Sequence, residues 1–309
     1  MNKRLQMELD DICLEIIEHS RLYVLASADN KRAIKLCSID TLSLLNMKQL
    51  FLSADIASKD IVSNEKQAES SVSLYFLMPG IGHGLRVNGE MHLEKEGARI
   101  DIRCAYLHCA RAAARAKLWA DLESTEHRYQ NVNVETMLQY SAYLFLKTRN
   151  SRGQVELSPR GDLPGFVKNV APNNLFIPER PGNKVAVSLR NILQDERVEL
   201  LMFLPGSCSL MRVVGKARLS TDPEYLEMTR VGNKPPKVGI LLRDCQFSMI
   251  NSEALNALQK DMQNGLFTVP TVKSFSKAFS EHTSGKGLKG KLAHIVIDGV
   301  VKKDMRSLY

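Results

Sequence analysis

The sequence predicts a mainly β protein with helices, an α+β fold made of two tandem copies of one barrel domain. Three blocks of self-similarity support this, in the same order in both halves of the 309 residues. Residues 76–89 match 202–215, and every aligned residue from Pro79 to Gly89 is offset by 126. The other two blocks pair 23–30 with 143–150 at an offset of 120, and 50–52 with 175–177 at 125. Ordered blocks with slowly drifting offsets are typical of a tandem duplication with insertions in loops.

Hydrophobic periodicity predicts the elements of each copy. Leu9, Ile12 and Ile16 share one face of an N-terminal helix. Short apolar segments bounded by Pro, Gly or charged residues, such as 72–78, predict strands. An alanine-rich stretch from about Ala105 to Leu122 favours a helix at the end of copy one. Successive strands with few helices between them favour a barrel over a parallel sheet.

The domain boundaries follow from the repeat and from composition. Copy one spans residues 1–122, and a charged, polar linker spans 123–140. Copy two spans 141–260, and a basic C-terminal extension spans 261–309.

Composition and charge exclude several classes of protein. A hydrophobic fraction of 44% with 25% charged residues is that of an ordinary globular protein. The N-terminus has no secretory segment and no run of about 18 apolar residues occurs, so we expect a cytoplasmic protein with no membrane partner. The net charge is +8, but the basic C-terminal extension lacks the interleaved aromatic residues that stack on bases, so we expect no nucleic-acid partner.

The cysteine pattern predicts no metal site. The six cysteines include no CxxC pair and no histidine spacing suited to zinc, apart from the adjacent His108 and Cys109. We therefore expect reduced, mostly buried thiols.

One hairpin of copy two is rich in groups that bind phosphate. The strings Ser158–Asp162 (SPRGD), Ile177–Lys184 (IPERPGNK) and Ser188–Asn191 (SLRN) flank a single predicted strand. Guanidinium groups bind phosphoryl oxygens bidentately, and glycine lets the backbone approach a ligand closely. Each string taken alone is also typical of a solvated turn.

Copy one carries a different row of distinctive residues. His108, Arg111, Arg115 and Trp119 recur at spacings of three, four and four, which places them on one face of the predicted helix. The alternative is an ordinary helix whose arginine stems lie along its surface and whose tryptophan anchors it to the core.

Together these strings resemble the motifs of the pyridoxamine 5′-phosphate oxidase-like family of FMN-binding split barrels, in the branch that carries SPRGD and RPGN. The resemblance covers residues 23–119 and 143–259. In that branch one domain carries all of the motifs, and two copies form a homodimer with flavin between them. The resemblance therefore implies two split barrels that form an intramolecular pseudo-dimer, with FMN as cofactor.

The two copies have lost different motifs. Where copy two has SPRGD, the repeat places Ser38-Ile39-Asp40 in copy one, without arginine or glycine. When Arg103 is aligned with Arg243, copy two has none of the distinctive residues of this copy-one row at the equivalent positions. Because these losses are complementary, we expect one composite site, with the phosphate on the copy-two strands and the ring toward the copy-one helix.

The resemblance implies roles for individual residues. The phosphate and ribityl chain would be held by Arg160, Arg180, Asn183, Lys184, Ser188, Arg190 and Asn191. From copy one, the flavin would be approached by His108, Arg111, Arg115 and Trp119.

These roles favour an FMN-dependent oxidoreductase of unknown substrate and electron donor, present as a monomeric pseudo-dimer or a homodimer. No catalytic acid, base or nucleophile is identifiable. The alternative is a non-catalytic protein that stores or senses flavin, or binds haem or the deazaflavin F420, with His83 and His108 as candidate haem ligands.

Overall fold

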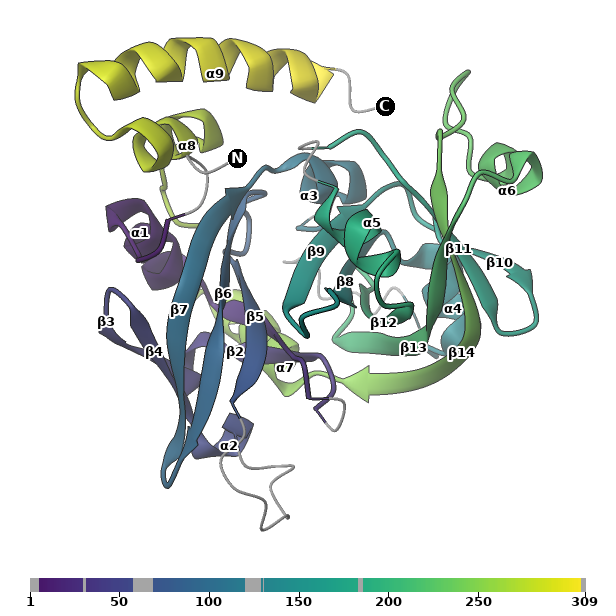
Figure 1. Ribbon diagram of the computed structural model, residues 1–309, viewed down its shortest axis with the longest axis horizontal. Helices are drawn as coiled ribbons and strands as arrows, with labels where there is room; N and C mark the ends of the chain where they lie inside the picture. The colour runs from purple at the N-terminus through teal and green to yellow at the C-terminus, as the bar shows by residue number, and fades with distance from the viewer. Residues whose placement is uncertain are drawn as a thin grey trace. The chain divides into compact units, whose positions relative to one another are not determined.

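The computed structural model describes residues 6–29, 32–57, 69–119, 129, 131–182 and 186–306. The chain divides into two compact units. Unit 1 contains Met1–Ala110 together with Val269–Leu308, and unit 2 contains Arg111–Thr268. Each unit is built on one seven-stranded sheet whose neighbouring strands are all antiparallel (Figure 1).

The sheet of unit 1 has the strand order β2-β1-β5-β6-β7-β4-β3. Its strands are β1 (Leu22–Ser27), β2 (Lys35–Ser38), β3 (Leu42–Asn46), β4 (Gln49–Ser53), β5 (Ser70–Leu77), β6 (Gly84–Glu94) and β7 (Gly97–His108). Its helices are α1 (Asp11–His19), the short 3-10 turn η2 (Ile39–Thr41), α2 (Ala54–Ala57), α8 (Phe275–Ser284) and α9 (Leu288–Arg306).

The sheet of unit 2 has the order β9-β8-β12-β13-β14-β11-β10. Its strands are β8 (Tyr143–Arg149), β9 (Val155–Gly161), β10 (Lys168–Ala171), β11 (Asn174–Pro178), β12 (Arg197–Phe203), β13 (Ser209–Ser220) and β14 (Gly239–Asn251). Its helices are α3 (Arg111–Ala116), α4 (Val134–Tyr140), α5 (Val187–Ile192), α6 (Pro223–Met228) and α7 (Glu253–Gln263).

The two sheets have the same topology. Counting strands along each unit, both sheets run second, first, fifth, sixth, seventh, fourth, third. Identical order in two seven-stranded sheets is the structural counterpart of the sequence repeat. The predicted fold class, mainly β with two tandem split barrels, is confirmed.

Strand register corrects two of the sequence alignments. Leu22 pairs with Leu77 and Tyr143 pairs with Phe203, so the first strands correspond at an offset of 121 rather than 120. The buried clusters agree, because Leu144 and Leu146 occupy the core positions of Tyr23 and Leu25. A one-residue slip would turn every side chain to the other face of the sheet.

The same registers change which residues of the two copies correspond, but they leave the conclusion about the lost motif unchanged. Ser38 pairs with Leu22 as Gly161 pairs with Tyr143, so the counterpart of Arg160 is Cys37. The last strands correspond at an offset of 142 rather than 140, since Tyr106 and Ser248 hold equivalent places. Copy one still lacks the arginine and the glycine of SPRGD.

Each sheet is capped by a helix that precedes its first strand. In α1 the side chain of Asp10 accepts a hydrogen bond from Cys13 N at 2.8 Å, and Ile12 and Ile16 are buried. In α4 Asn133 caps the helix in the same way and Met137 is buried. Side-chain caps satisfy backbone N–H groups that have no partner in the first turn. The predicted N-terminal helix is confirmed.

The helix predicted from Ala105 to Leu122 is wrong at its start. Strand β7 continues to His108, which pairs with Gly84 of β6, and α3 covers only Arg111–Ala116. The ladder with β6 overrides the helix propensity of alanine, because propensity is a weak prior against tertiary pairing. His108 therefore lies on a strand and does not share a helical face with Arg111 and Arg115.

Among the described residues, no helix is long and apolar enough to cross a membrane.

A buried ion cluster distinguishes unit 2 from unit 1. The carboxylate of Glu199 accepts hydrogen bonds from Lys147 Nζ and, at 2.9 Å, from Arg212 Nε. Burial raises the pKa of Glu199, but Lys147 and Arg212 lower it more, so its pKa lies below the ordinary value of 4.5. The equivalent residue in unit 1 is Ser73, whose hydroxyl donates to Asn88 at 2.7 Å.

Glu199→Gln should destabilise unit 2 by about 3 kcal/mol at pH 7, because the charge of Lys147 would remain buried without its carboxylate. Since the folded-state pKa of Glu199 is lowered, its contribution is complete above pH 4.5 and is lost as pH falls through the folded value. Denaturant unfolding should therefore show that the free energy of unfolding falls less between pH 7 and a pH below 4 in the variant than in the wild type. The exposed Glu253→Gln is the control, and equal losses in both variants would contradict this prediction.

Candidate functional site

Helix α3 is the element that joins the two sets of sequence motifs. It comes from the end of the first repeat, yet it belongs to unit 2, where it packs against β9 and β8 (Figure 1). A Cβ atom on Gly161 would lie 2.0 Å from the carbonyl oxygen of Ala112. The glycine of SPRGD is therefore required for the backbone of α3 to reach β9. In copy one the equivalent position is Ser38.

The arginines of α3 are buried in this contact. Arg111 is 9% exposed and Arg115 is 7% exposed. The guanidinium of Arg115 donates a hydrogen bond to the carbonyl oxygen of Pro181, in the RPGN turn. Arg115, which was predicted from copy one, thus contacts the RPGN turn, which was predicted from copy two, within unit 2.

Arg160 lies on β9 beside helix α5. Its Nη2 donates to Ser188 Oγ at 2.8 Å, and its Nη1 forms an ion pair with Glu179. Its Nε is buried and has no hydrogen-bond partner among the described residues. Ser188 is itself buried, at 5% exposure. Two contacts therefore hold Arg160 in place, and its Nε–H group can still donate a hydrogen bond.

Arg180 has a different role in the structure. Its Nε forms an ion pair with Asp162, which is 1% exposed, and its Nη2 donates to the carbonyl oxygen of Thr229 at 2.7 Å. These contacts tie the end of β11 to the SPRGD strand and to the end of α6. The aspartate of SPRGD thus holds the arginine of RPGN in place.

The remaining predicted ligands divide into three groups. Asn191 is buried and its amide donates to Thr148 Oγ1 at 3.0 Å, so it braces α5 against β8. Arg190 is exposed, because two residues along a helix turn a side chain away from the face of Ser188. Trp119 is half-buried in the turn after α3. Asn183 and Lys184 lie outside the described residues.

His108 lies in unit 1, within an aromatic cluster. Its ring centroid is 5.3 Å from that of Tyr75 and 5.2 Å from that of Tyr106, and the guanidinium of Arg86 lies 4.2 Å from the Tyr106 centroid. Burial, and then the charge of Arg86, lower the pKa of His108 well below the ordinary value, so the ring is neutral. The sequence analysis did not single out Arg86, Tyr75 or Tyr106, although Arg86 was part of the 126-offset block.

His83 is also held in the interior of unit 1. It is 7% exposed, its ring centroid lies 6.0 Å from that of Phe275, and burial lowers its pKa to about 4. Both candidate haem ligands are thus neutral imidazoles packed against aromatic rings.

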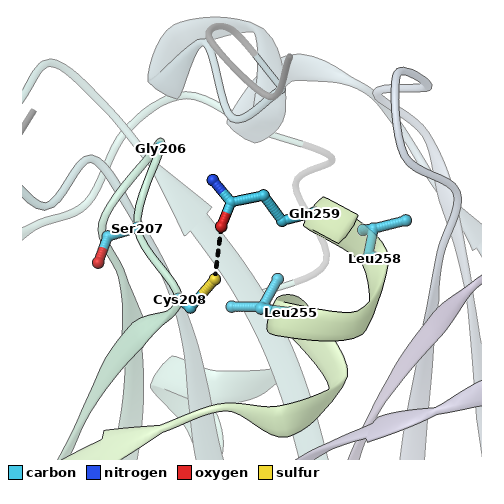
Figure 2. Close-up of a pocket in the computed structure, with 6 residues that line it drawn as sticks. All are labelled: Gly206, Ser207, Cys208, Leu255, Leu258 and Gln259. Atoms are coloured by element: carbon cyan, nitrogen blue, oxygen red, sulfur yellow. Dashed lines mark hydrogen bonds between the residues drawn. The ribbon is translucent and has the colours of Figure 1, made fainter. Parts of the chain in front are cut away.

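A small pocket in unit 2 is lined by a different set of residues, which includes none of these arginines. It is lined by Gly206, Ser207 and Cys208 of the β12–β13 turn and by Leu255, Leu258 and Gln259 of α7 (Figure 2). Cys208 Sγ lies 3.1 Å from Gln259 Oε1. The lining has no cationic side chain, so it does not offer the charge that a phosphate needs.

Arg111, Arg115, Arg160 and Ser188 therefore form the candidate site, which we call the α3–β9 cluster. Its guanidinium groups are largely withdrawn from solvent, and the described carboxylate that pairs with Arg160 is Glu179. Guanidinium donors held in a partly dry environment suit a phosphate or another oxyanion.

Gly161→Val should separate α3 from β9, because its side chain would need the space of the Ala112 carbonyl group. We expect a loss of about 3 kcal/mol in the free energy of unfolding of unit 2. Gly182→Ala, where the nearest atom would be the Arg180 carbonyl oxygen at 3.8 Å, should change stability little. Urea unfolding of both variants measures the difference. Equal stability of the Val variant and the wild type would show that α3 does not depend on this glycine.

Comparison with known proteins agrees with the fold and with the second repeat. Residues 131–244 match the sequence profile of the family described as "Pyridoxamine 5'-phosphate oxidase". No curated protein sequence matches the chain.

Several solved structures resemble parts of the chain. HupZ of Group A Streptococcus is 17% identical over 36% of this chain and 86% of its own, with a TM-score of 0.29. A putative pyridoxamine 5'-phosphate oxidase of Lactobacillus delbrueckii is 18% identical over 40% and 97%, with a TM-score of 0.29. A protein named F420 reductase is 18% identical over 38% and 98%, with a TM-score of 0.30.

TM-scores this low add nothing to the fold argument, which depends on strand order and register. The sequence profile covers β8 to β13 and the start of β14, and therefore includes SPRGD, RPGN and the helix that carries Ser188. The second repeat of the chain therefore matches the pyridoxamine 5′-phosphate oxidase-like family of split barrels.

Proposed function

We propose that the chain is an FMN-dependent oxidoreductase whose unit 2 binds the flavin phosphate at the α3–β9 cluster. The observation that supports this most is the seating of α3, which brings Arg111 and Arg115 against the strand that carries Arg160. Members of the family bind flavin or haem. The donor set of unit 2 is that of a phosphate site, which favours a flavin phosphate over haem.

The positive charge and the held positions of these arginines support a phosphate ligand. Arg160 is fixed by Glu179 and Ser188, so little rotamer entropy is lost when it binds an anion. Arg115 is fixed through the Pro181 carbonyl group in the same way. Preorganised arginines can form charge-assisted hydrogen bonds, which are stronger than neutral ones.

The bound flavin would supply hydride or electron transfer, and the protein would supply position and electrostatics. In this proposal Arg180 and Asp162 are positioning residues, because they hold the RPGN turn against the SPRGD strand. Asn191 positions α5, and with it Ser188, through Thr148. Trp119, in the turn after α3, would cover the ring.

Haem is the weaker alternative, because a haem-ligating histidine must be accessible to the iron. His83 and His108 are both buried and each packs on aromatic rings. An absorption spectrum of the purified protein separates these cofactors, since flavin and haem absorb at different wavelengths.

Arg160→Ala should weaken FMN binding about 10- to 100-fold, as expected for the loss of one charge-assisted contact of 1.5–3 kcal/mol. Binding of riboflavin, which lacks the phosphate, should change much less. Titration of the apoprotein with each flavin, followed by fluorescence quenching, measures both effects.

Arg152→Ala is the matched control, because this arginine is exposed in the turn between β8 and β9 and is not among the predicted ligands. It should leave the affinity for FMN within about twofold, well inside 1.4 kcal/mol. An equal loss in both variants, or an equal loss for FMN and riboflavin in Arg160→Ala, would argue against a phosphate site at the cluster.

A further inference from the structure

Three potential metal ligands converge in unit 1, far from the α3–β9 cluster in sequence. Asp10 is the N-cap of α1, Cys13 lies in its first turn, and His282 lies in the last turn of α8. One carboxylate oxygen, the thiol sulfur and one ring nitrogen all lie within 4.8 Å of one another. Among the described residues this is the one group of three such side chains placed to hold an ion.

The distances suit a small tetrahedral ion. His282 Nδ1 lies 2.8 Å from Asp10 Oδ2 and 3.9 Å from Cys13 Sγ. Ligands about 2.0 to 2.3 Å from a zinc ion are roughly 3.3 to 3.8 Å apart at tetrahedral angles. Shifts of about half an ångström would therefore bring the three ligands to one centre.

The environment favours a bound cation over free charges. The side chain of His282 is fully buried and Cys13 is 0% exposed, whereas that of Asp10 is 32% exposed. The opening at Asp10 provides an entry path and a position for a fourth ligand from solvent. A divalent ion with one carboxylate, one thiolate and one neutral imidazole makes a site with no net charge, which lowers the cost of burial.

We propose that Asp10, Cys13 and His282 form a binding site for one divalent transition-metal ion, with zinc as the best match, that fastens helix α8 to α1. Sulfur, nitrogen and oxygen ligands in a four-coordinate arrangement are those that zinc accepts. Among the described residues, the same region is also linked by Lys273 with Glu15 at 2.7 Å, by Lys286 with Asp11, and by the Gln6 amide with the His282 carbonyl group at 2.6 Å.

Binding would release one proton. A cysteine thiol is mostly S–H at neutral pH, whereas the thiolate is the form that binds a metal ion. The sulfur–metal bond replaces the S–H bond, and the proton leaves to solvent. Coordination through Nδ1 of His282 also requires the ring proton to be on Nε2, which is buried without a hydrogen-bond partner among the described residues.

The absence of a hydrogen-bond partner for His282 Nε2 among the described residues lowers the expected affinity. Loss of such a partner typically weakens a metal site 10- to 100-fold. We therefore expect a zinc site weaker than a closed four-cysteine site, with affinity that rises with pH because a proton is released.

Cobalt(II) titration of the reduced, full-length protein tests the site directly. We expect one equivalent to bind, with a sulfur-to-cobalt charge-transfer band in the near ultraviolet and displacement by zinc. Zinc at a hundredfold excess over its dissociation constant should raise the melting temperature of unit 1 by roughly 5 to 10 °C.

Cys13→Ser should abolish the cobalt band, and His282→Gln should abolish the zinc-dependent rise in melting temperature. Each variant is compared with itself with and without metal, so a loss of stability in the metal-free state does not affect the result. Cys208→Ser, which alters a thiol in unit 2, is the control and should keep both signals. A wild type that shows no cobalt–thiolate band, or a band that persists in Cys13→Ser, would overturn the proposal.

Discussion

The contact between α3 and β9 depends on the absence of a side chain at Gly161. Ala112 presents its carbonyl oxygen where a Cβ would stand, so the helix reaches the strand only because this residue is glycine. Arg111 and Arg115 take their places from that contact, and Arg115 in turn reaches the RPGN turn through Pro181. The candidate site of unit 2 therefore depends on the close approach of the α3 backbone to β9 at Gly161. The arginines around it take their positions from this approach.

The duplicated sheets explain why this contact exists in one unit. Both sheets have the same strand order, and the registers make Ser38 and Cys37 of unit 1 the counterparts of Gly161 and Arg160. A serine at the close-approach position adds a side chain where unit 2 has none, and a cysteine offers no positive charge to an anion. The ion cluster of Lys147, Glu199 and Arg212 is likewise specific to unit 2, with Ser73 in place of the glutamate. One topology thus carries two different sets of polar groups.

Much of the fold could be predicted from the sequence, because duplication and hydrophobic pattern are local signals. The strands, the N-terminal helix and the repeat are read from residues close together in the chain. Strand register could not be fixed in this way. The block from Tyr23 to Asn30 matched at an offset of 120, whereas cross-strand pairing gives 121, and a slip of one residue is invisible until a strand is seen against its neighbours. The helix predicted from Ala105 failed for a similar reason, since β6 extends β7 as far as His108.

The polar sites also show what could not be predicted from the sequence. SPRGD and RPGN could be identified as motifs, but the sequence did not show that Asp162 of one would pair with Arg180 of the other, or that Arg160 would contact Ser188. The spacing of cysteines and histidines describes only residues that are close together in the sequence. His282 and Cys13 are separated by 269 residues, and only the association of the C-terminal extension with α1 brings them together. Local motifs therefore indicate which residues can act, whereas long-range packing decides which of them have their hydrogen-bonding and ligating atoms already occupied.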